Sequence, residues 1–266
     1  MENHSDYLEV NRELWNKRTH IHVKSEFHEM DAFKSGKTSL KDIELALLGE
    51  IADKDILHLQ CHFGQDSLSL ARMGAKVTGA DFSDQAIEVA RELNKELKLD
   101  ARFVLSDVYT LPQVLKQSFD VVYTTYGVLG WLPDMDKWAQ VVAHFLKPDG
   151  KLVLVEFHPA VWMFDNDFTH VQYSYFNTET IIETEEGTYA DTSADINLAA
   201  VSWNHPLSEV FSALLKAGLH IEHFGEYDYS PYPCFNKIVA GETGKYYIKD
   251  MERKLPIVYS VIASKK

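Results

Sequence analysis

The stretch ILHLQCHFGQDSL, residues 56–68, decides the fold of this chain. It begins with a short apolar run, passes through a turn that contains Gly64, and continues into a segment with the apolar spacing of a helix. The stretch VTGADFS, residues 77–83, supplies a second strand and then offers Ser83 as the cap of a second helix. A strand, a helix and a second strand at this pace form a βαβ unit with parallel strands.

The same rhythm continues along the chain. The run at 119–124 is nearly all apolar, which is typical of a strand that is covered on both faces. We therefore predict the α/β class, with a doubly wound, mostly parallel sheet. Further strands are expected at 101–105, 152–157, 219–225 and 257–263, and further helices at 84–97, 136–146 and 207–217.

Two segments depart from this rhythm. Residues 1–50 are polar and helical and are expected to form an N-terminal lid. Residues 160–204 contain β-like runs at 171–176 and 180–183 and a turn at 186–187, which predict a β-rich hairpin insertion over the active site. The α/β core is expected in two parts, a cofactor-binding part at 51–159 and a C-terminal part at 205–266.

The composition excludes several classes of protein. The chain has 266 residues, of which 45% are hydrophobic, so it can build a core and is not mainly disordered. Its net charge of −14 disfavours nucleic acid and anionic membranes as partners. The sequence starts without a signal-peptide pattern, and its longest apolar stretch, 121–133, is too short to span a bilayer. We expect a cytoplasmic protein with a small ligand.

The two cysteines carry little information about chemistry. Cys61 and Cys234 cannot form a disulfide framework, and their spacing fits no zinc pattern. No metal site is predicted. Cys61 is expected to fill core space, because no lysine or arginine adjoins it in the sequence.

Asp81 is the first candidate for ligand binding. In open parallel sheets, ligands bind beyond the carboxyl ends of the strands, near the point where strand order reverses. Asp81 ends the second strand, 17 residues after Gly64. A carboxylate in that place can accept hydrogen bonds from both hydroxyls of a ribose. The alternative is a helix cap or a surface side chain.

Several pieces of the sequence occur in a characteristic order. They are L-x-L-Q-C-H-F-G-x-D at 57–66, VTGADFS at 77–83, SDV at 106–108, FDVVY at 119–123 and LKPDG at 146–150. With these pieces, the chain resembles the class I S-adenosylmethionine-dependent methyltransferases, and more narrowly a bacterial branch that acts on small molecules. The resemblance implies a Rossmann-like sheet of seven strands with the last one antiparallel, and S-adenosyl-L-methionine as cofactor.

The first motif departs from the pattern of that family. The resemblance implies that the turn with Gln60, Cys61, His62 and Gly64 approaches the methionine part of the cofactor. The family's usual acidic residue is His58 here, and two of its three glycines are Gln60 and His62. Because glycine lets backbone approach a ligand closely, both side chains must either turn aside or supply new contacts. The G-x-G-x-x-G spacing of a dinucleotide site is absent, so a nicotinamide cofactor is the weaker alternative.

The resemblance also assigns roles after the other strands. Asp81 is implied to hold the ribose and Phe82 to lie against the adenine. Asp107 is implied to accept from the adenine amino group. Residues at the end of the fourth strand are implied to face the sulfonium and the substrate. The set implied here is Asp81, Phe82, Ser106, Asp107, Val108, Tyr123 and Tyr126.

The acceptor side is less defined. A hydroxyl or amine acceptor must lose a proton, and histidine is the side chain best matched to this near neutral pH. His158, just past the fifth strand, and His205, before the last long helix, are candidate general bases; His20 and His22 follow them. For each of these, a surface or structurally bonded imidazole is the alternative.

Trp15 and Arg18 are candidates to close over the cofactor. An aromatic face suits a sulfonium, and a guanidinium suits a carboxylate. The alternative is that Trp15 anchors its helix to the core and that Arg18 is solvated. Aromatic side chains at 126, 131, 162, 173, 175 and 203 suggest a pocket for a flat or moderately apolar small molecule.

Together these observations predict a methyltransferase that acts on oxygen or nitrogen of a small-molecule acceptor. The expected protein is a monomer or a homodimer with no nucleic acid and no membrane as partner. A non-catalytic protein that binds S-adenosylmethionine or S-adenosylhomocysteine is the alternative, because the glycines of the first motif are reduced to one. A nicotinamide-dependent oxidoreductase is a further alternative.

Overall fold

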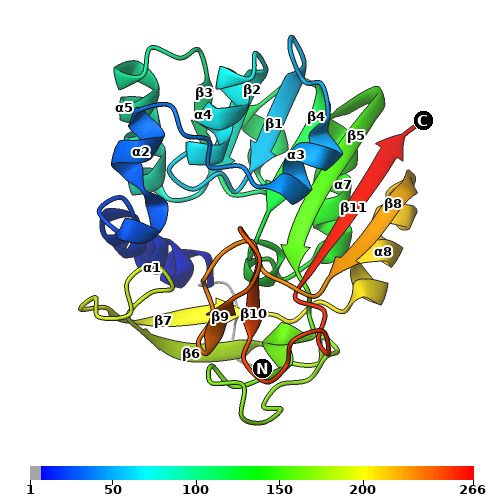
Figure 1. The fold of residues 1–266 in the computed structure, drawn as a ribbon. Helices are drawn as coiled ribbons and strands as arrows, with labels where there is room; N and C mark the ends of the chain where they lie inside the picture. Colours follow the sequence, from blue (N-terminus) through cyan, green and yellow to red (C-terminus); the bar gives the residue numbers. More distant parts are fainter. Residues whose placement is uncertain (1–6) are drawn as a thin grey trace.

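Seven strands form the central sheet in the computed structural model, which describes residues 7–266 (Figure 1). Their order is β3–β2–β1–β4–β5–β11–β8. Only β11 runs antiparallel to its neighbours, and the predicted doubly wound, mostly parallel sheet is confirmed. The strands are β1 (Asp55–Leu59), β2 (Lys76–Asp81), β3 (Arg102–Leu105), β4 (Phe119–Thr125), β5 (Leu146–Phe157), β8 (Leu219–Tyr227) and β11 (Val258–Lys265).

Helices cover both faces of the sheet because alternate strand residues point to opposite sides. On one face, Leu57 and Leu59 of β1 pack in a core shared with α6 (Leu111–Val114), α7 (Met135–Phe145) and α8 (Leu207–Lys216). On the other face, Ile56 packs in a core with α3 (Asp42–Leu48) and α4 (Gln65–Arg72). The helix α5 (Asp84–Glu96) packs near β3, and Ser83 caps it by accepting from the backbone N–H of Ala86 at 3.0 Å.

The N-terminal helices approach the sheet from two sides: the first lies at the end where the parallel strands finish, and the last covers one face (Figure 1). They are α1 (Tyr7–His22), the short 3₁₀ helix η2 (Glu26–His28), α2 (Met30–Lys34) and α3. Asn11 of α1 donates to the carbonyl of Val201 at 2.8 Å and accepts from the N–H of Val201 at 2.9 Å. Asn16 accepts from the Ser83 hydroxyl at 2.6 Å, so α1 is joined both to the sheet and to the segment after β5.

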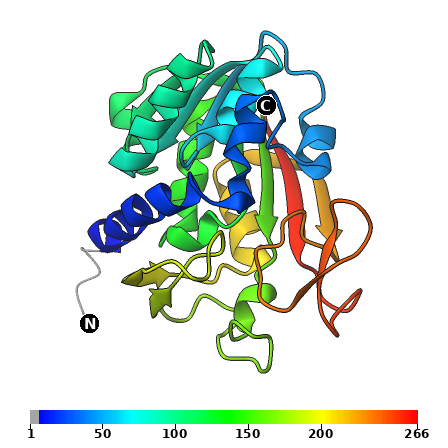
Figure 2. The same cartoon turned by 60° about the vertical axis from the view of Figure 1, so that its left-hand side comes forward.

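That segment contains a two-stranded hairpin, β6 (Ile181–Glu186) with β7 (Asn197–Ser202). Figure 2 shows the hairpin beside α1. The expected strand at 171–176 is wrong: within the described residues this run makes a single isolated bridge, between Phe164 and Val171. Val171 and Phe176 are exposed, because no neighbouring strand supplies a ladder for them.

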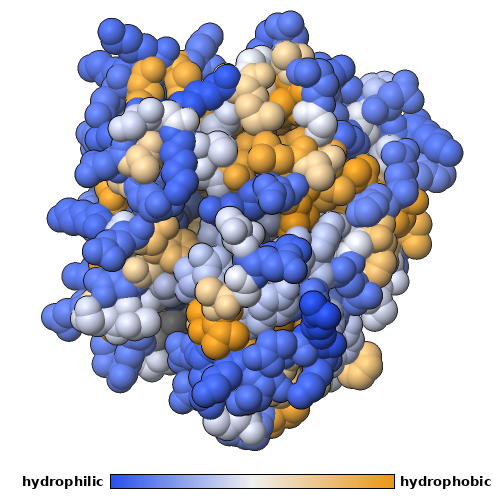
Figure 3. Space-filling model, in the orientation of Figure 1, coloured by the Kyte–Doolittle hydropathy of each residue, from blue (hydrophilic) through white to orange (hydrophobic). Residues whose placement is uncertain are grey.

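A second excursion was not expected from the sequence. Residues 228–257 leave the sheet between β8 and β11 and include the short strands β9 (Ile238–Ala240) and β10 (Tyr246–Ile248). In Figure 1 this excursion and the hairpin gather at the same end of the sheet. Hydrophilic side chains cover most of the face drawn in Figure 3, and apolar ones gather beside α3. Within residues 7–266, no helix combines the length and apolar character needed to cross a membrane.

Candidate functional site

A cavity of about 620 Å³ lies at the carboxyl ends of β1, β2, β4 and β5. Gln60 and His62 line it after β1, Asp81 at the end of β2, and Tyr126 after β4. The N-terminal helices, the hairpin and the second excursion cover it with Trp15, Tyr189 and Tyr232. A hollow of about 30 Å³ adjoins it, shares Gln60, Asp81 and Phe82 with it, and is lined also by Ser106, Asp107 and Val108. Sheet topology thus brings the nucleotide-site candidates together.

The turn after β1 keeps the backbone shape of a glycine-rich loop although two of its residues carry side chains. Gln60 has φ of 54°, His62 of 51° and Gly64 of 82°, all in the left-handed region. That region costs a non-glycine residue about 1 kcal/mol or more. Both side chains are held in place on the cavity wall: the Gln60 amide donates to the Val128 carbonyl at 2.9 Å, and the His62 ring packs edge-on to Trp15 at 5.3 Å between centroids.

Asp81 links the turn to the second strand. Its carboxylate accepts from the backbone N–H of Ser83 at 2.9 Å and of His62 at 2.8 Å. Burial raises the pKa of Asp81 to about 6, although these backbone donors favour the charged form. A carboxylate has about four acceptor positions, so this one can accept further hydrogen bonds from a ligand.

The residues after β3 are partly engaged within the protein. The Asp107 carboxylate accepts from the N–H of Tyr109 at 2.9 Å and of Thr110 at 3.1 Å, and it also contacts the Thr110 hydroxyl. Ser106 donates to the Asp107 carbonyl at 2.9 Å, and Val108 is buried. Ser106, Asp107 and Val108 therefore shape the small hollow.

Cys61 and His58 face the interior of the fold. The Cys61 thiol is buried beside Phe63 and Phe103, and burial raises its pKa well above the ordinary value, so it is a core filler although it reaches the cavity wall. His58, which replaces the family's acidic residue, is buried, and its Nδ1 lies 2.8 Å from the Ser67 hydroxyl. Burial lowers the pKa of His58 to about 3.

Trp15 and Arg18 form one wall of the cavity, where the sequence placed them. The Arg18 guanidinium lies over the Trp15 ring at 5.0 Å and near the Trp131 ring at 5.7 Å. Arg18 is buried, so the alternative of a solvated side chain is wrong. The indole of Trp15 has no hydrogen-bond partner for its Nε1 within the described part of the chain.

The two histidines expected as general bases do not line the cavity. His158 Nε2 lies 3.1 Å from the Glu226 carboxylate, and its Nδ1 accepts from the N–H of Ala160 at 3.1 Å. Side chains alternate along a strand, and since Phe157 lines the cavity, His158 turns to the opposite side. We therefore correct this expectation: His158 is a structural residue.

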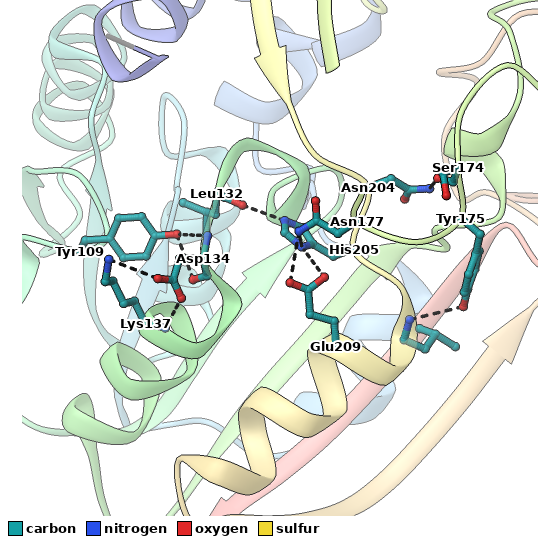
Figure 4. A network of polar contacts seen from close by, with 11 residues as sticks. Tyr109, Leu132, Asp134, Lys137, Ser174, Tyr175, Asn177, Asn204, His205 and Glu209 are labelled. Atoms are coloured by element: carbon teal, nitrogen blue, oxygen red, sulfur yellow. Dashed lines mark hydrogen bonds and ion pairs between the residues drawn. The ribbon is translucent and has the colours of Figure 1, made fainter. Parts of the chain in front are cut away.

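His205 is structural as well. Figure 4 shows its ring between the Leu132 carbonyl and the Glu209 carboxylate, and the residue does not line the cavity. Nε2 lies 2.7 Å from that carbonyl, and Nδ1 lies 3.0 Å from that carboxylate. The ring thus ties the N-terminus of α8 to the segment that follows η3 (Leu129–Trp131). His20, the lesser candidate, is exposed on α1.

The two tyrosines of the fourth strand behave differently. Tyr123 is fully buried in the core beneath α3 and α4 and does not line the cavity, so its expected role there is wrong. Tyr126, which has φ of 45°, lines the cavity and donates from its hydroxyl to Glu44 at 2.7 Å. Glu44 is buried, and burial, followed by the charge of Asp66, raises its pKa to about 7.

Sequence reasoning missed several residues of the site. Glu156, at the end of β5, accepts from the N–H groups of Val128 at 2.8 Å and of Leu129 at 3.0 Å, and so fixes the loop after β4. Glu156 makes no hydrogen bond to the His158 ring, whose partners are Glu226 and Ala160. Glu44, His28, Tyr189 and Tyr232 were also missed. Of these residues, only Glu44 could have been found from the sequence. It is a charged residue on the apolar, buried side of a predicted helix, and such residues are rarely buried without a partner.

Comparison with known proteins agrees with this geometry. Residues 56–150 match the family model described as a methyltransferase domain. The chain is 30% identical over 151 residues to a ubiquinone biosynthesis O-methyltransferase of Proteus mirabilis, covering 50% of this chain and 61% of that protein. It is 29% identical over 153 residues to a demethylmenaquinone methyltransferase of Lactococcus lactis, covering 55% and 60%. The match thus spans about three fifths of these relatives' lengths.

Solved structures share the whole fold. An S-adenosylmethionine-dependent methyltransferase from Mesorhizobium loti aligns with a TM-score of 0.57 at 20% identity, over 87% of this chain and 100% of that one. One from Clostridium acetobutylicum aligns with a TM-score of 0.58 at 14% identity, over 95% and 99%. The chain therefore matches a methyltransferase domain over residues 56–150, and its fold is that of the solved S-adenosylmethionine-dependent methyltransferases.

Proposed function

We propose that this protein is an S-adenosyl-L-methionine-dependent methyltransferase that acts on oxygen or nitrogen of a small molecule. The observation that carries the proposal is the Asp81 carboxylate, buried at the end of β2 on the wall that the cavity and the small hollow share. Its position matches the ribose-binding carboxylate of nucleotide sites in open parallel sheets. We assign the protein to the bacterial small-molecule branch on the strength of its first motif.

The residues of the turn fit the amino-acid end of this cofactor. Gln60 Oε1 is buried and has no hydrogen-bond partner within residues 7–266, and such an acceptor suits an ammonium group. Arg18 offers a guanidinium to a carboxylate, and Trp15 offers a ring face to a sulfonium. Phe82, with the hollow lined by Ser106, Asp107 and Val108, is our proposed place for the adenine, because the hollow continues from Asp81.

The cofactor supplies an electrophilic methyl group on a sulfonium, and the chain has to align the acceptor and take up its proton. Alignment supplies a large part of the rate of such a displacement. For the proton we propose Tyr126 and Glu44: Tyr126 lines the cavity, and its hydroxyl donates to Glu44. A carboxylate whose pKa lies at about 7 can accept a proton relayed through that hydroxyl near neutral pH.

The acceptor is proposed to be a flat or moderately apolar small molecule. Aromatic rings at Tyr126, Tyr232 and Phe157 contribute to the cavity wall. A cavity of about 620 Å³ is in the range of small-molecule sites. The two relatives described above are named for ubiquinone biosynthesis and for demethylmenaquinone, which are also small-molecule chemistry. Nucleic acid and anionic membrane are disfavoured partners because the net charge is −14. A cytoplasmic monomer or homodimer remains our proposal.

A non-catalytic binder of the same cofactor is the second candidate. The observation in its favour is the turn itself, in which Gln60 and His62 replace glycines. A sensor would bind S-adenosylmethionine without transferring its methyl group, so a single-turnover assay with an acceptor panel separates the two candidates.

Calorimetric titration tests the proposal first. We expect S-adenosylmethionine and S-adenosylhomocysteine to bind in the micromolar range, and NADH not to bind. Binding by the first two would justify the acceptor screen, with transfer followed by the release of S-adenosylhomocysteine. If neither binds, the proposal fails for both candidates; if NADH alone binds, the oxidoreductase alternative replaces it.

A further inference from the structure

Three histidines from distant parts of the chain converge beside the cavity. His22 ends α1, His28 ends η2, and His62 lies in the turn after β1. The ring centroids are 5.1 Å apart for His22 and His62, 5.3 Å for His22 and His28, and 6.0 Å for His28 and His62. One ring nitrogen from each residue lies within 4.8 Å of the other two.

Two of these rings carry buried nitrogens with no hydrogen-bond partner among residues 7–266. They are Nε2 of His22 and Nε2 of His62. His22 has no solvent-exposed surface. Buried polar atoms are rarely left without a partner, because the loss of solvation costs about 1–3 kcal/mol. Two such nitrogens on adjacent rings indicate a site where a proton donor or a metal ion could bind both rings.

The third ring is held with a lone pair available. The side-chain amide of Gln65 donates to the His28 carbonyl at 2.8 Å, which fixes the direction of its oxygen. That oxygen lies 3.1 Å from His28 Nδ1, so Nδ1 carries the proton and Nε2 does not. An N–H···O bond behind a ligating imidazole is the common way in which proteins orient histidine toward a metal.

We propose that His22, His28 and His62 form a site for a divalent transition metal, most specifically Zn²⁺. Neutral imidazole is a preferred ligand of zinc, and three histidines with an open fourth position are typical of a site that binds a further ligand. Zn–N bonds of about 2.0–2.1 Å place ligand nitrogens about 3.4 Å apart, so the rings need to approach by little more than 1 Å. The proposal does not rest on the proposed function, although the site adjoins the same cavity.

The ionisation of the cluster agrees with metal binding. Burial, mutual repulsion and the Arg18 charge keep the rings uncharged: the pKa of His22 falls to about 2, and that of His28 falls to about 4, chiefly through burial. Uncharged rings are the form that binds metal. Arg18 also repels a cation, and for this reason we expect the fourth ligand to be anionic.

The open position faces the cavity. His28 and His62 line it, and the Tyr189 hydroxyl lies 3.4 Å from His22 Nδ1 and 3.5 Å from His28 Nε2. An oxygen anion in the cavity, either a hydroxide or a carboxylate, would lie between the metal and Arg18. Both sources share the same chemistry and are separated below.

The test uses the untagged, full-length protein after dialysis against EDTA. Zn²⁺ is titrated in competition with a chromophoric chelator, and Co²⁺ is titrated while visible absorption is recorded. We expect one metal per chain and the absorption bands of four- or five-coordinate Co²⁺. A spectrum that changes when acetate is added identifies a carboxylate as the fourth ligand, and one that changes only with pH identifies hydroxide.

Four variants make the test decisive. His62→Gly keeps the fold, because φ of 51° suits glycine, and we expect it to weaken Zn²⁺ binding by about 100-fold or more, as does His22→Gln. Gln65→Ala should weaken it by about 10–100-fold through the orientation of His28. His144→Ala removes an exposed histidine from α7 and should change nothing. Stoichiometric Zn²⁺ binding that survives both His62→Gly and His22→Gln, or no binding by the unmodified chain, overturns the proposal.

Discussion

Replacement of Asp81 by asparagine should change both the pH dependence of stability and the affinity for the proposed cofactor. Burial raises the pKa of this carboxyl from 3.8 to about 6, so the carboxyl is ionised at pH 7.5 at a cost to the folded state. Each pKa unit corresponds to about 1.4 kcal/mol, which gives about 3 kcal/mol in total. Asparagine removes the charge, but its amide nitrogen cannot accept the backbone N–H that one Asp81 oxygen now accepts, so Asp81→Asn should recover this energy less about 1–3 kcal/mol for the lost hydrogen bond.

The direction of the Asp81 pKa shift fixes how the free energy of unfolding depends on pH. Because the pKa is raised in the folded state, the contribution of Asp81 to stability is complete below pH 3.8 and is lost as the pH rises through about 6. Between pH 5 and pH 7.5, the free energy of unfolding of the variant should therefore rise by about 1.4 kcal/mol relative to that of the unmodified protein. Urea unfolding at the two pH values measures the difference.

Affinity should fall in the same variant. The amide has one accepting oxygen, so at least one charge-assisted bond to the ribose is lost, about 1.5–3 kcal/mol, or about 10–100-fold in Kd for S-adenosylhomocysteine by calorimetry. Asp84→Asn is the control: Asp84 is exposed three residues further on, and hydrogen bonds from Gln85 and Asn16 lower its pKa, so its loss should not stabilise the fold. Unchanged affinity in Asp81→Asn would remove Asp81 from the site, and an unchanged stability difference between the two pH values would refute the burial argument.

Three more predictions concern the surroundings of the site. Gly64→Ala should destabilise more than Gly218→Ala by about 1 kcal/mol or more in urea unfolding, since both have φ near +80° but only at Gly64 does a Cβ meet Phe103, at 2.8 Å; equal losses would contradict the packing argument. The free energy of unfolding should fall as the pH rises through about 7 because ionised Glu44 is buried, and Glu44→Gln should lack this fall; the same pH slope in both proteins would count against it. His205→Ala should lower stability by about 1–3 kcal/mol by freeing the Leu132 carbonyl, with no change in calorimetric affinity for S-adenosylhomocysteine; a weaker Kd at normal stability would return His205 to the site.

The sheet and the place of the cavity at its end follow from local sequence. Strands buried on both faces read as continuous apolar runs, and a carboxylate at the end of β2 stands next to the turn after β1 in any sheet of this order. Asp81 and the turn were found for this reason. The left-handed backbone at Gln60 and His62 could be anticipated only through the family pattern, since neither residue type favours it.

The predictions that were wrong or missing concern residues whose positions depend on tertiary contacts. His158 was chosen by its distance along the chain, but the alternation of side chains along β5 turns it away from the cavity. Tyr123 failed in the same way, because its ring points into the core beneath α3. His28 and His62 meet only because η2 packs on the turn after β1, and no spacing in the sequence encodes that contact. The excursion at 228–257 has strands of three residues, too short for a periodic signal.

Asn11 joins the first helix to the hairpin that covers the cavity. Its side-chain amide bonds both the N–H and the carbonyl of Val201, as a backbone partner in a neighbouring strand would. These two hydrogen bonds therefore couple α1 to β7 of the hairpin. A displacement of the hairpin would therefore have to carry α1, and with it Trp15 and Arg18 of the cavity wall, or break both hydrogen bonds.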